Sequence, residues 1–270
     1  MKKASLLTVV AAGLLSMLVP ASMSAQTTTT TTPTTTTAAT PSIGQTIQLG
    51  ATRSPLAPPA CPKGVSAVNC KIVLTQETAL ETLRDGVAYP STVTQPGLIV
   101  AWTVGLSRLS ALTGAAHTAI HYLDTTFGGT TQAGISVLAP VGAKNQRQWK
   151  VVASSPIVHL QPYLGYVVQF PLATPLPVVA GEVVALTVKT WAPVLSFDLT
   201  PSLFAYRQSR SSNCTVPATT SHAQLTIGQS TRYTCNYAGT RVEYSATEIT
   251  TPSPPKNQVH ARLQRNKRNL

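Results

Sequence analysis

Two histidines, His117 and His121, form the first pattern with a recognisable chemistry. On a helix, residues four apart share a face and can bind zinc, but a zinc protease of that kind needs a glutamate directly after the first histidine. Thr118 occupies that position, and Thr118, Ile120 and Tyr122 alternate as in a strand. We therefore expect a strand with two outward-facing histidines and no metal site.

The carboxylates give little support for acid–base catalysis. The chain has only 8 Asp and Glu residues, and a glycosidase needs two that face each other across the substrate. Glu77, Glu81 and Asp85 have the spacing of one solvated helical face. Asp124 and Asp198 are the acids flanked by apolar or aromatic residues. An exported hydrolase with an Asp/His site assembled by the fold is therefore kept as an alternative function, although no Gly-x-Ser-x-Gly or phosphate-binding glycine motif is present.

A basic and aromatic cluster is the best candidate for a binding site. It consists of Lys144, Arg147, Trp149 and Lys150, on an expected hairpin loop and the start of the next strand. An indole can stack on a sugar ring, and the three cations can meet an anion. In the alternative interpretation Trp149 packs inward. Trp191, at an expected strand end, either joins this binding surface or belongs to the core.

The four cysteines predict two disulfides. They are Cys61, Cys70, Cys214 and Cys235, which allow three pairings. We favour Cys61–Cys70 and Cys214–Cys235, because the members of each pair are close in sequence and the chain between them has loop or hairpin character. The loop-closure model assigns each such cross-link about 3 kcal/mol. The sequence has neither a Cys-x-x-Cys motif nor a His-rich cluster, so we expect no metal and no cofactor.

The elements that must position these residues are mainly strands. Apolar residues alternate over 97–107, 182–190 and 241–247, and Gly/Pro turns separate the runs. In the first run Leu98, Val100, Trp102, Val104 and Leu106 are expected on one face. Helical periodicity is limited to Thr75–Asp85, where Leu80 and Leu83 predict one short helix. We predict an all-β fold, a two-sheet antiparallel sandwich of jelly-roll type.

The ends of the chain differ in composition from this β region. Residues 1–25 have the charged start, apolar middle and small-residue end of a secretory signal peptide. Residues 26–42 form a Thr-rich linker, and 251–270 form a basic tail rich in proline, so we expect disordered termini around a domain at 43–250. The expected location is outside the cytoplasm: secreted, on the cell surface or periplasmic, with no membrane span after signal cleavage.

The net charge of +12, from 20 basic and 8 acidic residues, suggests a polyanion or nucleic-acid binder. The signal carries +2 and the tail +5, which leaves +5 on the region between them. That charge is too weak to predict a nucleic-acid face, and the sequence has no aromatic RNA-binding motif or recognition helix.

Three segments carry a loose resemblance to known proteins. They are Gly181-Glu182-Val183-Val184-Ala185-Leu186-Thr187-Val188-Lys189-Thr190-Trp191-Ala192-Pro193, Phe127-Gly128-Gly129 and Tyr233-Thr234-Cys235-Asn236-Tyr237. Together they resemble uncharacterised secreted bacterial β-sandwich proteins over about residues 97–247. The resemblance implies the fold and export, and it implies no catalytic residue.

The sequence thus favours a secreted, non-catalytic binding domain at or near the cell envelope, with a glycan or a polyanion as its partner. The alternatives are the exported hydrolase and a structural subunit of an extracellular complex.

Overall fold

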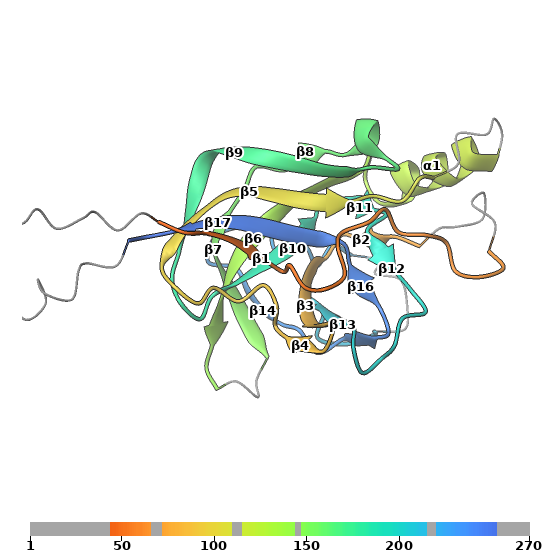
Figure 1. Cartoon of the computed structure of the whole chain (residues 1–270). Coiled ribbons are helices and arrows are strands. Elements are labelled where there is room, and N and C mark those ends of the chain that lie inside the picture. The colour runs from red at the N-terminus through yellow and green to blue at the C-terminus, as the bar shows by residue number, and fades with distance from the viewer. Residues whose placement is uncertain (1–43, 66–71, 110–114, 144–146, 215–219, 253–270) are drawn as a thin grey trace, which may run out of the picture. The chain divides into compact units, whose positions relative to one another are not determined.

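A computed structural model describes residues 44–65, 72–109, 115–143, 147–214 and 220–252, except for the side chains of 115–119. These residues form mostly β structure in antiparallel sheets that include a curled half-barrel, together with one α-helix of 12 residues (Figure 1). The all-β class predicted from alternation is confirmed. The predicted signal peptide, linker and nearly all of the basic tail lie outside the described residues.

The smaller of the two main sheets has four strands. Its order is β1 (Thr46–Leu49), β17 (Tyr244–Thr250), β5 (Gly97–Gly105) and β9 (Val167–Val178). Figure 1 shows β9, β5 and β17 running side by side. Strands from both ends of the domain therefore meet in one sheet.

The larger sheet has nine strands and carries the candidate site. Its path runs β14 (Ser230–Arg232), β7 (Gln148–Ser154), β6 (Gln132–Val141), β10 (Val183–Val188), β3 (Thr78–Arg84), β13 (Ala205–Gln208) and β15 (Asn236–Ala238). Two short strands join it at the sides: β4 (Val87–Ala88) pairs with β3, and β8 (Val158–His159) pairs with β6.

The remaining elements are short. β11 (Trp191–Ala192) pairs with β2 (Leu74–Thr75), and β12 (Leu195–Ser196) pairs with β16 (Arg241–Val242). The helix α1 spans Ala115–Thr126, and a 3-10 turn, η2, spans Gln161–Tyr163. No helix within the described ranges is both long enough and apolar enough to cross a bilayer.

Apolar side chains cover both faces of the nine-stranded sheet. All six residues of β10 are buried. Val184, Leu186 and Val188 join the main core with Trp102 of β5, whereas alternation turns Val183 and Ala185 to a second cluster. The second cluster also contains Leu80, Leu138, Val151 and Tyr233, and Trp149 packs against it. This second face is where the candidate site lies.

The helix predicted over Thr75–Asp85 is wrong, because the segment contains the strand β3. Ala, Leu, Glu and Arg favour a helix in isolation, but here the segment pairs with both β10 and β13 inside the sheet. Tertiary pairing outweighs a propensity of a few tenths of a kcal/mol per residue. Two of the three acids predicted to be solvated are consequently buried, since Glu77 is 2% exposed and Glu81 0%. The third, Asp85, is half-buried and accepts hydrogen bonds from Thr52 and Ser54.

The strand predicted around His117 and His121 is also wrong, since both residues lie in α1. The apolar residues that anchor the helix are Leu123 and, just after it, Phe127, which pack against Trp191. The four-residue spacing of His117 and His121 fits a helix. Over so short a stretch, the alternation of Thr118, Ile120 and Tyr122 fits a strand equally well.

The prediction that alternate apolar residues of 97–107 share one face is correct only in part. Trp102, Val104 and Leu106 are buried as expected, but Leu98 is 43% exposed and Ile99 is buried in its place. The register between β5 and its neighbours shifts between Ile99 and Ala101. One extra residue in a strand exchanges its two faces, so alternation before the bulge points the other way.

Candidate ligand-binding site

A hollow of about 350 Å³ opens on the second face of the nine-stranded sheet. Its wall includes Tyr89, Pro140, Val141, Arg147, Trp149 and Val183. Small-molecule sites generally measure about 300–1,000 Å³ and combine apolar walls with a few polar groups. We refer to this cavity as the aromatic hollow.

Trp149 reaches the hollow from the start of β7. There it pairs with Pro140 on β6 and with Thr231 on β14. The indole is half-buried and packs against the second apolar cluster. Trp149 was expected either to bind a ligand or to pack inward, and it does part of each. One part of the indole packs against the apolar cluster, and another part lines the hollow.

Tyr89 supplies the second aromatic ring. Its ring centroid lies 6.3 Å from that of Trp149, with 42° between the ring planes. The residue follows β4, where its N–H donates to the carbonyl of Thr82 and its carbonyl accepts from Thr92. The tyrosine is 38% exposed. Two aromatic rings thus border the hollow with part of their surface open to solvent.

Arg147 places a cation beside these rings. Arg147 and Tyr89 both have left-handed backbones, with φ of 50° and 46°. That conformation costs a non-glycine residue roughly 1–3 kcal/mol and is concentrated at functional sites. The backbone carbonyl of Arg147 accepts a 2.9 Å hydrogen bond from Tyr233, which helps to hold the strained residue. Two strained residues on one wall support a binding role for the hollow.

The structure separates the residues that the sequence grouped together. Arg147 and Trp149 share the hollow, whereas Lys150 follows Trp149 on β7, is exposed, and does not line it. Lys144 lies outside the described residues. Trp191 is 0% exposed, and its indole N–H donates to Asp124 at 2.9 Å and to the carbonyl of Gly129 at 3.1 Å. Trp191 is therefore a core residue and does not form part of this surface.

Tyr89 was missed in the sequence because nothing near it points to Trp149. The two residues are 60 positions apart and are brought together by the pairing of β4 with β3 and of β6 with β7. In the sequence, Tyr89 followed by Pro90 indicates only a turn. A single sequence does not show which distant strands pair with one another.

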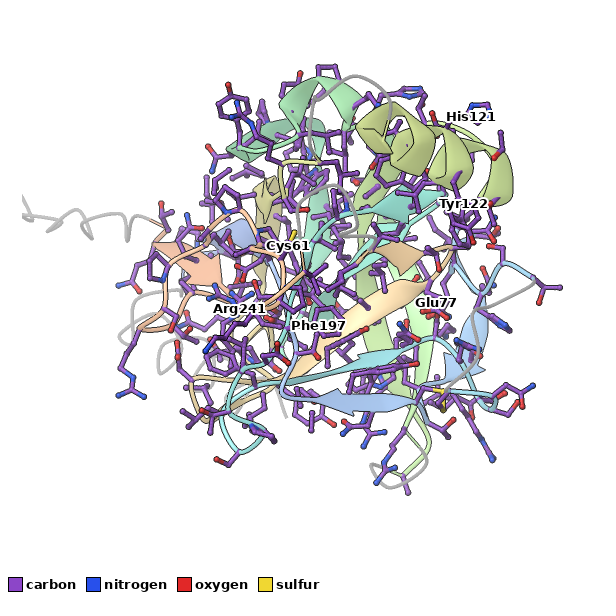
Figure 2. The ribbon with its side chains drawn as sticks, turned by 90° about the vertical axis from the view of Figure 1, so that its right-hand side faces the viewer. Cys61, Glu77, His121, Tyr122, Phe197 and Arg241 are labelled. Atoms are coloured by element: carbon purple, nitrogen blue, oxygen red, sulfur yellow. A yellow bond between two sulfur atoms is a disulfide. The ribbon has the colours of Figure 1, made fainter. Side chains whose placement is uncertain are left out.

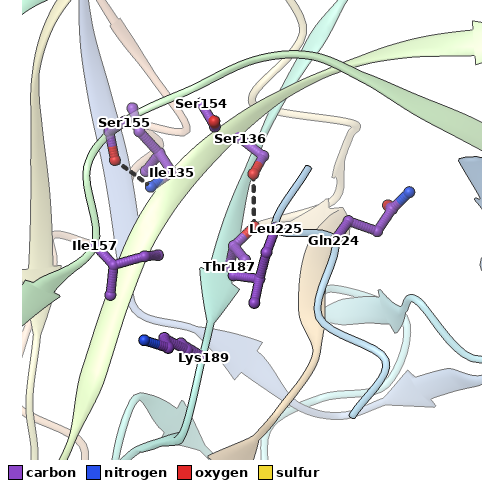
Figure 3. A pocket seen from close by; sticks show the side chains of 9 residues that line it. All are labelled: Ile135, Ser136, Ser154, Ser155, Ile157, Thr187, Lys189, Gln224 and Leu225. Carbon is purple, nitrogen blue, oxygen red and sulfur yellow. Dashed lines mark hydrogen bonds between the residues drawn. The ribbon is translucent and has the colours of Figure 1, made fainter. Parts of the chain in front are cut away.

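A second cavity of about 210 Å³ lies on the same face of the sheet (Figure 3). Val183 lines the aromatic hollow and Thr187, four residues later on β10, lines this cavity, so alternation puts both on one side. Four of its nine lining residues carry a hydroxyl group, and the hydroxyl oxygens of Ser136 and Thr187 are hydrogen-bonded at 2.7 Å. Thr187 is also 3.1 Å from Thr78. Because these hydroxyls already bond one another and the volume is small, the aromatic hollow is the stronger candidate.

Buried ion pairs account for three of the carboxylates. Glu77 pairs with Arg210 at 3.3 Å, Glu81 with Arg84 at 2.8 Å and Glu243 with Arg241 at 3.2 Å. Figure 2 shows Glu77 well separated from Arg241, whereas the charges of the Glu81–Arg84 and Glu243–Arg241 pairs act on one another. In the same view His121 and Tyr122 lie on α1.

Burial dominates the electrostatics of these carboxyl groups. It raises the pKa of Glu77 to about 7 despite Arg210, and it raises the pKa of Glu81 to about 7 despite Arg84. The carboxyls are nevertheless poor candidates for catalysis, because each is almost fully covered. Within the described residues, neither of the two cavities is lined by an acid or a histidine.

The acids expected to serve a hydrolase have other partners or positions. Asp124 accepts the indole N–H of Trp191, and Asp198 is exposed in a left-handed backbone conformation with φ of 57°. Among the described residues there is no group of three or more potential metal ligands.

The Cys214–Cys235 disulfide is confirmed, with the two Cα atoms 5.2 Å apart. Cys70, the partner expected for Cys61, lies outside the described residues. Beside the confirmed bridge, the hydroxyl of Tyr237 donates to the carbonyl of Cys214 at 2.7 Å, and the rings of Tyr237 and Tyr206 stack at 5.0 Å.

Comparison of the chain with family models, with curated proteins and with solved structures finds no match. The function therefore has to be argued from the geometry of the aromatic hollow.

Proposed function

We propose that this chain is an exported, non-catalytic binding protein that holds a glycan against Trp149 and Tyr89 in the aromatic hollow. The observation that carries the proposal is the pair of partly exposed rings at 6.3 Å beside Arg147. Aromatic faces stack on the C–H faces of sugar rings, and polar rims fix their orientation.

The wider setting of the proposal comes from the sequence. The signal-like residues 1–25 support export, and the two main antiparallel sheets support a jelly-roll-type sandwich like that of the secreted β-sandwich proteins it resembles. The Cys214–Cys235 bridge fits an oxidising compartment, since disulfides persist outside the reducing cytosol. A location at or near the cell envelope follows from these features as part of the proposal.

A binding assay with matched tyrosine variants tests the function. Isothermal titration with a panel of soluble oligosaccharides, and pull-down on insoluble cell walls, are carried out with the full chain. Tyr89→Ala and Trp149→Ala are each expected to weaken binding at least tenfold. Tyr166→Ala is the matched control, because Tyr166 is 59% exposed and does not line the hollow.

The controls separate loss of the site from loss of the fold. Circular dichroism and thermal melting of each variant show whether the domain remains folded, which matters most for the half-buried Trp149. Absence of glycan binding by the wild-type chain, or equal binding by Tyr89→Ala and wild type, overturns the proposal.

The basic tail supports a second candidate, binding of a polyanion. Five basic residues and no acid occur within 251–270, and such blocks bind anionic polymers through long-range attraction. Pull-down with and without this segment tests the tail separately from the hollow, and equal retention of the two forms argues against it.

A further inference from the structure

We infer that the ligand of the aromatic hollow is an acidic sugar, whose ring lies on Trp149 and Tyr89 and whose carboxylate is held by Arg147 and Arg207. This inference rests on the proposed function and names the class of glycan. Three observations carry it: the bonding of two arginines to one fixed residue, the lack of an acidic partner for either in the described part of the chain, and the two rings beside Arg147.

Both arginines contact the backbone of Tyr233, Arg147 through its main-chain carbonyl and Arg207 through its guanidinium. The carbonyl of Arg147 accepts from the N–H of Tyr233 at 2.9 Å. From the other side, the guanidinium of Arg207 on β13 donates to the carbonyl of Tyr233 at 3.1 Å and to that of Thr234 at 2.9 Å. Tyr233 itself is fixed, since it is 0% exposed and belongs to the second apolar cluster. Arg147 lines the hollow, whereas Arg207 does not line it and is joined to Arg147 through this fixed residue.

The two positive charges are close enough to affect each other. Burial and the neighbouring charge of Arg147 lower the pKa of Arg207, and Tyr89 acts on the same group in the opposite direction. All eight side-chain carboxylates lie within the described residues, and ion pairs connect three of them to Arg84, Arg210 and Arg241. In this described part of the chain neither Arg147 nor Arg207 pairs with a carboxylate. Two like charges held together without a counterion favour an anionic ligand.

The nearest acid in sequence to the wall does not neutralise the pair. Glu182 lies between Gly181 and Val183, which both line the hollow, but its carboxylate accepts the backbone N–H of Val179 at 2.9 Å. It therefore bonds within the turn before β10, and among the described residues it forms no ion pair with either arginine.

The chemistry of the site selects a ring that carries an acid. Guanidinium groups bind carboxylates through parallel, charge-assisted hydrogen bonds. A linear polyanion would use the arginines but not the rings, and a neutral sugar would use the rings but not the arginines. A sugar acid uses both, within a hollow of about 350 Å³.

Pairs of ligands that differ only in charge give the sharpest test. Isothermal titration of the full chain uses oligomers of galacturonate, glucuronate and mannuronate, each compared with its fully methyl-esterified form. At least one free acid is expected to bind tenfold or more tightly than its ester at pH 7. Arg147→Gln and Arg207→Gln are each expected to reduce this preference to less than threefold, while the ester still binds.

Two controls keep the test specific. Lys150→Gln removes an exposed cation from the same strand as Trp149 without touching the hollow, and is expected to leave the preference unchanged. Arg207→Lys retains the charge but loses the planar fork, so it reports on Arg207 if the glutamine variant does not fold. An intermediate preference is expected for this lysine variant.

The outcomes distinguish the inference from the proposed function. Equal affinity for acid and ester overturns the inference while glycan binding stands. Binding of neutral oligosaccharides with no binding of any uronate also overturns the inference alone. Absence of binding to uronates, esters and neutral glycans overturns both.

Discussion

Half of the side-chain carboxyl groups in this chain are buried, so even fewer acids are available at the surface than the sequence suggests. Glu77, Glu81, Glu243 and Glu248 are all at most 2% exposed. Three of them have an arginine partner, and the carboxylate oxygens of Glu248 have no hydrogen-bond partner among the described residues. Of the three acids expected on a solvated helical face, Glu77 and Glu81 are therefore internal, whereas Asp85 is half-buried.

A substitution at Arg210 is expected to reveal the buried charge of Glu77. Arg210→Met removes the cation 3.3 Å from the Glu77 carboxylate, and the loss of one partner from a buried pair costs about 3–5 kcal/mol. The pKa of Glu77, already raised to about 7, will rise further. Urea unfolding at pH 8 and pH 5 is expected to show a larger loss of stability at pH 8.

The sign of this pH dependence follows from proton binding. A carboxyl whose pKa is raised by folding holds its proton in the native state above pH 4.5, where the unfolded chain has released it. Stability therefore falls as pH rises from about 4.5 towards the folded-state pKa. The control compares the double variant Glu77→Gln/Arg210→Met with Glu77→Gln alone, and the cost of losing Arg210 should then be the same at both pH values. A pH-independent cost of Arg210→Met alone would contradict the assignment.

At the scale of elements, a strand was predictable where the apolar pattern of its own segment was enough to identify it. The alternation of 182–190 predicted β10 correctly, and both of its faces are buried because it lies between β6 and β3. The Thr75–Asp85 segment failed because pairing with β10 and β13 overrides its helical composition. The bulge after Ile99 likewise depends on the neighbouring strands.

The same division applies to the candidate site. Arg147 and Trp149 were predictable, because a basic and aromatic cluster on a hairpin is visible in a short stretch of sequence. Tyr89 and Arg207 were not, since they come from the segment after β4 and from β13, and only the tertiary fold brings Tyr89 to Trp149 and Arg207 to Tyr233. Trp191 was undecided from sequence because its burial depends on α1, which was predicted as a strand.

Removal of the Cys214–Cys235 bridge is expected to weaken the edge of the larger sheet at β13 and β15. Cys235 is 0% exposed and comes directly before β15, and the bridge joins residues 21 positions apart. Closure of a loop of this size stabilises the fold by about 3 kcal/mol. Cys214→Ser/Cys235→Ser should therefore lower the urea-derived free energy of unfolding by about 2–4 kcal/mol.

Mass mapping of the non-reduced wild-type chain supplies the matching control for this disulfide. A disulfide-linked peptide that joins Cys214 to Cys235 is expected. Its absence would mean that the stability difference reflects the serine substitutions themselves and not the loss of a bridge. Equal stability of the double variant and the oxidised wild type would show that the sheet edge does not depend on the bridge.

At the scale of the whole molecule, the exposed charges of the described residues are almost all positive. Among the described residues seven basic side chains are exposed, and Asp198 is the one exposed carboxylate. The exposed cations are Arg53, Lys63, Arg108, Arg147, Lys150, Lys189 and Arg232. The +5 of the region between signal and tail is therefore carried largely at the surface, where it adds to the five charges of the tail.

Two electrostatic modes follow from this distribution, and deletion of residues 253–270 should separate them. All five basic residues of the tail lie in the deleted segment. Long-range attraction to a polymer depends on the summed charge and is screened by salt, with a Debye length of about 10 Å at 0.1 M. The shortened chain is therefore expected to elute from a sulfated-polysaccharide column at a clearly lower salt concentration than the full chain.

Binding in the aromatic hollow should be unaffected by the same deletion, because it depends on contacts with Trp149, Tyr89 and the two arginines. Titration of the shortened chain with the preferred uronate oligomer is expected to give an affinity within about twofold of the full chain. Arg147→Gln in the full chain should have the opposite profile, with weak uronate binding and nearly normal retention on the column. A parallel loss of both activities on deletion would mean that the tail and the hollow bind one ligand together.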